Sequence, residues 1–187
     1  MNQKISKSKK PLKHPDQRVG VFIDVQNLYY SAKNLHSKKV NFGEIVKEAS
    51  EGRKLIRAIA YVVRTESKDE QPFFEALYNL GIETREKDLQ IFFGGSKKAD
   101  WDVGLTVDAI RLSSSLDIIV LVSGDGDYVP LIEYIQKSAG KQVEVMAFGD
   151  TTSAKLIEAS DAFTDLSEFD KKYLISDKKR HPRLRKK

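Results

Sequence analysis

The 187-residue sequence contains no cysteine, and no apolar run approaches the roughly 18 residues that span a bilayer. The lack of cysteine excludes disulfides, thiolate nucleophiles and cysteine-based zinc sites. The stretch 1–18 lacks the apolar segment of a secretory signal. With 40% hydrophobic and 32% charged residues, the composition is typical of a globular chain. We therefore expect a cytoplasmic protein that does not enter a membrane.

The net charge of +5 conceals an uneven distribution along the chain. Residues 1–18 and 171–187 together carry +13, whereas residues 19–170 carry −8. The two ends lack hydrophobic periodicity, so we predict one folded domain over 19–170 between two basic flexible tails, 1–18 and 171–187. Such tails suit a polyanion, because neutralised phosphates release counterions, although purely solubilising tails have the same composition.

Within the predicted domain, apolar runs alternate with amphipathic stretches. The runs predict strands at 19–24, 55–63, 82–85, 89–93, 118–122, 143–148 and 163–166. The amphipathic stretches predict helices at 27–35, 42–49, 71–80, 101–112, 128–138 and 153–159. Near-continuous Val and Ile, as in 118–122, indicate strands buried on both faces of a parallel sheet. We predict an α/β fold of three layers with a central, mainly parallel sheet.

Two of the predicted strands lead directly into aspartates. The first ends at Asp24, and 118–122 runs into a turn that contains Asp125 and Asp127. In open α/β sheets, functional groups gather at the carboxyl ends of the strands. Helix capping explains one such aspartate, but repeated carboxylates beside buried strands suggest a shared cation.

A further acid comes from the predicted helix 101–112. Asp102 and Asp108 are six residues apart, so on a helix they point about 120° away from each other and cannot serve one ion together. We predict that Asp102 belongs to the site, that Asp108 lies on a solvated or packing face, and that Asp100 is an N-cap. Clustered carboxylates without cysteine or nearby histidine favour Mg²⁺ or Mn²⁺, the ions of phosphate chemistry.

Several other catalytic patterns are missing. The sequence contains no G-x-x-x-x-G-K-[ST] motif, which excludes a standard P-loop, and no G-x-S-x-G nucleophile elbow. The pair Gly124-x-Gly126 lacks the third glycine of a dinucleotide fingerprint.

Cations and aromatic residues flank the acids in the sequence. Lys97 and Lys98 are candidates for holding a flanking phosphate, and Trp101 is the best candidate for stacking on an unpaired base. Tyr128 and at least one of Tyr29 and Tyr30 are expected in the core. The pair 92–93, Phe-Phe, favours core or an oligomer face, which leaves a homo-oligomer open.

Three segments resemble the motifs of one known family. The first, 21–28 (VFIDVQNL), resembles the hydrophobic strand and D-x-x-N motif that open NYN domains. The second, 98–103 (KADWDV), is similar to the family's K-x-x-D helix start, and the third, 123–131 (SGDGDYVPL), resembles its S-G-D-x-D-[FY] motif. Together and in this order, the three motifs resemble those of the LabA-like branch of the NYN family, within the PIN-like nuclease superfamily. The resemblance covers roughly residues 19–169.

This resemblance implies a Rossmann-like PIN fold and a metal-dependent ribonuclease. The acids that it implies as catalytic and metal-binding residues are Asp24, Asp102, Asp125 and Asp127. It further implies that Asn27 and Ser123 orient a ligand or a metal-bound water, while Gln26 departs from the small residue common at its position. The expected partner is RNA, with single strands favoured. A regulatory RNA-binding module and a nucleotide phosphohydrolase remain alternative functions.

Overall fold

A sheet of six parallel strands forms the centre of the computed structural model, which describes residues 13–64, 70–88, 90–91, 97–98 and 100–176. In spatial order the strands are β4 (Glu83–Asp88), β3 (Lys54–Arg64), β1 (Arg18–Asp24), β7 (Ile118–Val122), β8 (Gln142–Ala147) and β9 (Ala162–Asp165). Every neighbouring pair in this sheet is parallel, which confirms the predicted sheet type.

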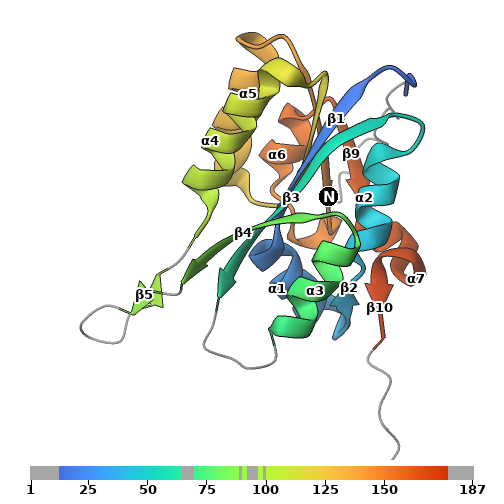
Figure 1. Cartoon of the computed structure of the whole chain (residues 1–187), viewed down its shortest axis with the longest axis vertical. Helices are drawn as coiled ribbons and strands as arrows, with labels where there is room; N and C mark the ends of the chain where they lie inside the picture. The colour runs from blue at the N-terminus through green and yellow to red at the C-terminus, as the bar shows by residue number, and fades with distance from the viewer. Residues whose placement is uncertain (1–12, 65–69, 89, 92–96, 99, 177–187) are drawn as a thin grey trace, which may run out of the picture.

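Helices cover both faces of this sheet, as Figure 1 shows. One face carries α1 (Val25–His36), α2 (Phe42–Ser50), α3 (Gln71–Asn79) and the short α7 (Asp170–Tyr173). The other carries α4 (Asp102–Leu112), α5 (Val129–Lys137) and α6 (Ala154–Ala159). The predicted three-layer α/β fold is therefore confirmed.

The alternation of side chains along β1 explains why its sequence is apolar throughout. Val21 and Ile23 pack into the core beneath α1 and α2, whereas Phe22 packs into the core beneath α4 and α5. Successive residues of a strand point to opposite faces, so a strand covered on both sides must be apolar at every position.

The strand order also fixes where a site can form. From β1 the chain proceeds outward to β3 and β4, whereas from β7 it proceeds the other way to β8 and β9. Open α/β sheets with this order bind ligands at the carboxyl ends of the two strands where the direction reverses. Those ends are Asp24 on β1 and the residues that follow Val122 on β7.

Shorter elements complete the described chain. They are the 3₁₀ turns η1 (Ser113–Ser115), η2 (Gly126–Tyr128), η3 (Gly149–Thr151) and η4 (Leu166–Phe169), and two small antiparallel pairs, β2 (Lys39–Val40) with β10 (Leu174–Ile175) and β5 (Gln90–Ile91) with β6 (Lys97–Lys98). The predicted strand 89–93 is described only over β5, and Phe92 and Phe93 lie outside the described residues. No helix among the described residues is long and apolar enough to cross a membrane.

The C-terminal boundary predicted at residue 170 is too early. Tyr173 is 2% exposed and packs into the core with Leu174, and β10 pairs with β2. The apolar stretch 173–175 is short and follows Lys171 and Lys172, so its sequence is typical of a basic tail. At the other end, Arg18 already belongs to β1, and Lys13 forms ion pairs with Glu48 and Glu51.

Candidate functional site

Asp24, the last residue of β1, is held by two hydrogen bonds at the start of α1. Its Oδ1 accepts from the backbone N–H of Asn27 at 3.0 Å, which caps the helix, and its Oδ2 accepts from Ser123 Oγ at 3.2 Å. The side chain is largely buried, and the residue is only 8% exposed. The helix therefore begins at Val25, two residues before the predicted start, because Asp24 is its N-cap.

The turn after β7 is tied to the end of β1. Asn27 Oδ1 accepts from the Gly124 N–H at 3.0 Å, and the Asp125 N–H donates to Ser123 Oγ at 3.2 Å. Asp125 in turn caps η2, because its Oδ1 accepts from the Asp127 N–H at 3.0 Å. Ser123 is fully buried, and its hydroxyl links the two strand-end acids by donating to Asp24 and accepting from the Asp125 N–H.

Asp102 reaches this turn from the first turn of α4. The hydroxyl of buried Tyr128 donates to Asp102 Oδ1 at 3.1 Å. One carboxylate oxygen from each of Asp102, Asp125 and Asp127 lies within 4.8 Å of the other two. Asp108 points elsewhere, as its helical position predicts: its Oδ2 accepts from Tyr61 and lies 3.6 Å from Arg85 Nε.

Burial and mutual repulsion act on these acids together. Burial raises the pKa of Asp24 to about 6, and the nearby charges of Asp102 and Asp125 add to the rise. The pKa of Asp102 is also raised, first by burial and then by the acids around it, against the hydrogen bond from Tyr128. Such a cluster is costly without a compensating positive charge.

The chemistry of the donors fits a hard divalent cation. The three converging groups are carboxylates from α4 and the η2 turn, and oxygen ligands of this kind suit Mg²⁺ and Mn²⁺. Asp24 adds negative charge beside them from the end of β1. Exposed acids also cluster without an ion, but here Asp24 is buried and Asp102 and Asp125 are only partly exposed, which leaves Asp127 as the one exposed acid of the four.

The acids open into a cleft of about 350 Å³. Besides Asp24, Asp102 and Asp125, its lining includes Gln26, Asn27, Tyr30, Asn34, Asp100 and Trp101. Asp100 does not cap α4 as predicted, because the N-cap position is Trp101 and no side-chain cap bond forms there. It joins the acidic wall of the cleft instead.

Trp101 is fixed at the edge of the cleft by its own packing. Its indole N–H donates to the Val62 carbonyl at 2.9 Å, and its ring lies edge-on to Tyr61 with centroids 5.5 Å apart. Lys87 Nζ stands 5.7 Å from the centre of the same ring. The backbone of Lys97 and Lys98 forms β6, but their side chains lie outside what the structure describes.

Two tyrosines on α1 differ from expectation. Tyr128 is buried as predicted, but Tyr29 and Tyr30 are both about half exposed, at 48% and 52%. The buried face of α1 is instead made by residues such as Leu28 and Ala32. Tyr30 is therefore a cleft residue that the sequence did not predict, although its spacing from Leu28 already places it on another side of the helix.

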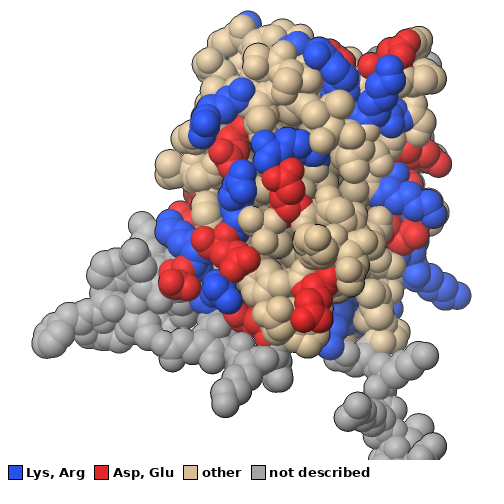
Figure 2. Space-filling model, viewed as in Figure 1, with Lys and Arg blue, Asp and Glu red and all other residues tan. Residues whose placement is uncertain are grey.

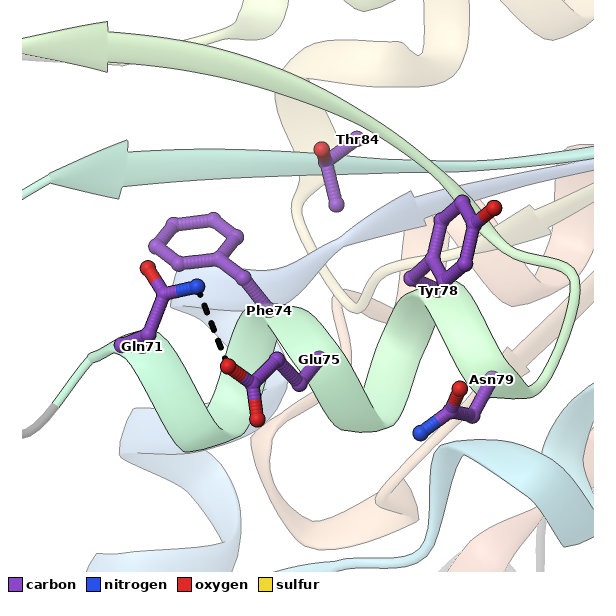
Figure 3. Close-up of a pocket in the computed structure, with 6 residues that line it drawn as sticks. All are labelled: Gln71, Phe74, Glu75, Tyr78, Asn79 and Thr84. Carbon is purple, nitrogen blue, oxygen red and sulfur yellow. Dashed lines mark hydrogen bonds between the residues drawn. The ribbon is translucent and has the colours of Figure 1, made fainter.

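A second hollow, of about 490 Å³, lies between α3 and the edge strand β4 (Figure 3). Phe74 and Tyr78 line it from the helix and Thr84 from the strand. Its single acid, Glu75, accepts a hydrogen bond from Gln71 at 3.2 Å. Over the face shown in Figure 2, cations and acids are interspersed, without one basic patch.

Comparison with known proteins identifies a family, a relative and a solved structure that are similar to this chain. The family model for the NYN domain matches residues 18–168. The low amplitude and bright protein LabA of Synechococcus elongatus is 26% identical in an alignment of 166 positions that covers 81% of this chain and 84% of that protein. A crystal structure of a protein of unknown function from Vibrio parahaemolyticus superposes with a TM-score of 0.79 at 30% identity, covering 88% of this chain and all of that one. The chain belongs to the NYN domain family.

Proposed function

We propose that this protein is a ribonuclease that hydrolyses phosphodiesters of single-stranded RNA with bound Mg²⁺ or Mn²⁺. The observation that carries the proposal is the convergence of the Asp102, Asp125 and Asp127 carboxylates within 4.8 Å, beside buried Asp24, at the switch point of the sheet. Membership of the NYN family and similarity to LabA support an RNA-related nuclease or regulatory role.

Each residue of the site has a distinct task in this proposal. Asp102, Asp125 and Asp127 hold the ion, and Asp24 adds charge and fixes the η2 turn through Ser123. A bound divalent ion supplies an activated water and offsets charge on the leaving oxygen. Tyr128 keeps Asp102 in place, and because burial and the acids raise its pKa, its hydroxyl stays protonated and able to donate.

The substrate assignment rests on charge and on the shape of the cleft. An acidic cleft repels a phosphate backbone, so attraction must come from cations around it, for which Lys97, Lys98 and the basic chain ends are the candidates. We assign Asn27 and Trp101 to the wall that an RNA strand would meet, because both line the cleft.

The direct test is cleavage of an end-labelled single-stranded RNA by wild type, Asp125→Asn and Glu133→Gln. Wild type should cut with Mn²⁺ or Mg²⁺ and not with EDTA, and Asp125→Asn should cut no faster than wild type in EDTA. Glu133 is a half-exposed acid on α5 that pairs with Lys137, so its variant should keep full activity.

Circular dichroism checks that each variant folds. Cleavage that persists in Asp125→Asn, or in wild type with EDTA, would exclude this site as its source. RNA that wild type binds with Mn²⁺ but leaves uncut would identify the regulatory alternative.

A further inference from the structure

One row of side chains leads away from the acids along α1. Gln26, Tyr30 and Asn34 are spaced at four-residue intervals, and all three line the cleft that contains Asp24 and Asp125. Residues four apart lie on one face of a helix, with a rise of about 1.5 Å per residue. The cleft therefore extends for roughly 12 Å, or about two helical turns, from the acidic end.

The side chains of this row make few contacts with the described part of the fold. Tyr30 is 52% exposed, and among the aromatic rings of the described residues its partner is Tyr29, edge-on with ring centroids 5.5 Å apart. Within the described parts of the chain, the side-chain amides of Gln26 and Asn34 make no hydrogen bond to protein. The core contacts of α1 come from its other face, through Leu28 and Ala32.

The composition of the row selects one kind of occupant. It holds a single aromatic ring between two amides and no cation, so it offers little to a phosphate, which the neighbouring acids would repel in any case. It also lacks the successive apolar residues that an amphipathic partner helix needs. A nucleobase fits all three groups, because it has a π-face for the ring and paired donors and acceptors for the amides.

We propose that Gln26, Tyr30 and Asn34 form a subsite for one unpaired nucleobase, next to the phosphate that the acids address. This inference rests on the proposed function, since it assumes a nucleic-acid strand in the cleft. Tyr30 stacks on the base and supplies affinity that tolerates any sequence. Gln26 and Asn34 contact the base edge and supply preference.

Binding without cleavage tests the subsite. Fluorescent hexanucleotides are titrated with wild type, Tyr30→Phe, Tyr30→Leu and Tyr134→Leu in EDTA at low salt. Tyr30→Leu should weaken binding about 5- to 150-fold, the range of one stacked base, while Tyr30→Phe keeps the ring and the affinity. Tyr134, on α5, is 46% exposed and outside the cleft, so Tyr134→Leu serves as the matched control and should bind like wild type.

An abasic scan locates the contact. Removing one base at a time should weaken wild-type binding at one position of the hexanucleotide, and at that position Tyr30→Leu should lose nothing further. The same pattern is expected with DNA, because the subsite contacts the base and not the 2′-hydroxyl. The proposal would be overturned if Tyr30→Leu and wild type bound the intact strand equally well. It would also be overturned if Tyr30→Leu weakened binding of a fully abasic strand as much as it weakens binding of the intact one.

The amides have their own readout. Gln26→Leu and Asn34→Leu should flatten the difference in affinity among U, C and A hexanucleotides, and an unchanged preference in both would overturn their role. These measurements need no metal, so they separate the subsite from the proposed function. Failure of wild type to cut RNA would contradict the ribonuclease proposal. The subsite proposal is tested separately, by the effect of Tyr30→Leu on base-dependent binding in EDTA.

Discussion

Asp24 is subject to opposing influences. Hydrogen bonds from Asn27 and Ser123 favour its charged form, whereas burial and the charges of Asp102 and Asp125 favour its neutral form. The second group prevails, because the pKa rises to about 6. The folded protein therefore binds this proton more tightly than the unfolded chain does, and without a metal it loses stability as the pH rises from about 4 through 6.

Replacing Asp24 with Asn removes this dependence. At pH 8 without metal, Asp24→Asn should be more stable than wild type by up to about 3 kcal/mol, since one pKa unit corresponds to about 1.4 kcal/mol. Asn caps a helix as well as Asp does, so α1 keeps its start. At pH 4 the difference should shrink toward zero. Urea denaturation at both pH values measures it, with Glu133→Gln as the control, and a less stable variant at pH 8 would contradict the prediction.

For single residues, the sequence predicts the acids of the site better than it predicts the neighbouring side chains around them. Asp24, Asp125 and Asp127 follow apolar strands and Asp102 starts a helix, so topology alone brings them to one edge of the sheet. The spacing of Tyr30 from Leu28 separates the two on α1, but it does not show that Tyr30 lines the cleft. The burial of Ser123 follows from packing between segments about 100 residues apart, which no local pattern records.

Among the elements, α4 and the η2 turn meet through negative charge. Asp102 belongs to α4, while Asp125 and Asp127 belong to the turn, so a bound cation would join two segments that otherwise repel each other. Among the described residues, the hydrogen bond that joins these acids across the two segments is the one from the Tyr128 hydroxyl to Asp102.

A cation should therefore stabilise the fold. Mn²⁺ or Mg²⁺ at 100 times its dissociation constant should add about 2.7 kcal/mol to the free energy of unfolding. Thermal melts in EDTA and with metal measure the gain, and Asp127→Asn should reduce it most cleanly because its carboxylate accepts no hydrogen bond from the described residues. A shift of equal size in Asp127→Asn would place the ion elsewhere.

Another contact between elements lies beneath α2. Arg53, in the turn after α2, donates to both carboxylate oxygens of Glu144 on β8, at 2.6 and 3.0 Å, and also to the Ala49 carbonyl. The Arg53 side chain is fully buried. By contrast, Arg57 and Glu83 form a similar two-pronged pair between β3 and β4, which is about one third exposed.

Because the two ion pairs differ in burial, we expect their loss to lower the free energy of unfolding by different amounts. Glu144→Gln leaves the buried Arg53 charge uncompensated and should destabilise the protein by about 3–5 kcal/mol. Glu83→Gln breaks an exposed pair and should cost no more than about 1 kcal/mol. Urea denaturation of both variants compares them, and similar losses would mean that burial does not govern the strength of these pairs.

Long apolar elements are predictable from the sequence, and short ones are not. The residues 118–122 form the predicted strand because five successive Val, Ile and Leu residues can only be buried on both faces. The pair β2 and β10 has two residues on each side, and Leu174 becomes a strand residue only by meeting Val40. Too few residues repeat in such segments to show a period.

For the whole molecule, positive charge concentrates at the ends of the sequence. Residues 1–12 carry +4 and residues 177–187 carry +6, whereas the predicted domain 19–170 is acidic. A truncation at the boundaries predicted from sequence would also remove Arg18 and Tyr173. Arg18 binds Asp117 through its guanidinium and its backbone N–H, and Tyr173 is buried, so that truncation would damage the fold.

A truncation to residues 13–176 tests the tails without this damage. It should weaken binding of single-stranded RNA and flatten the salt dependence, because the slope of log K against log salt is about −0.7 for each neutralised phosphate. Fluorescence titrations across a salt series measure both, and the metal-induced thermal shift should stay as in the full chain. An unchanged slope would show that the tails do not contact RNA.

One of the clustered acids has a second, structural role that bears on how relatives should be compared. Asp125 caps η2 through Oδ1, so selection for folding alone would retain it in a descendant that had ceased to cut anything. Asp24 caps α1, but Asn would serve there equally well, and Asp127 caps nothing among the described residues. Across homologues, loss of the carboxylates at positions 24, 102 and 127 should therefore mark the lineages without nuclease activity.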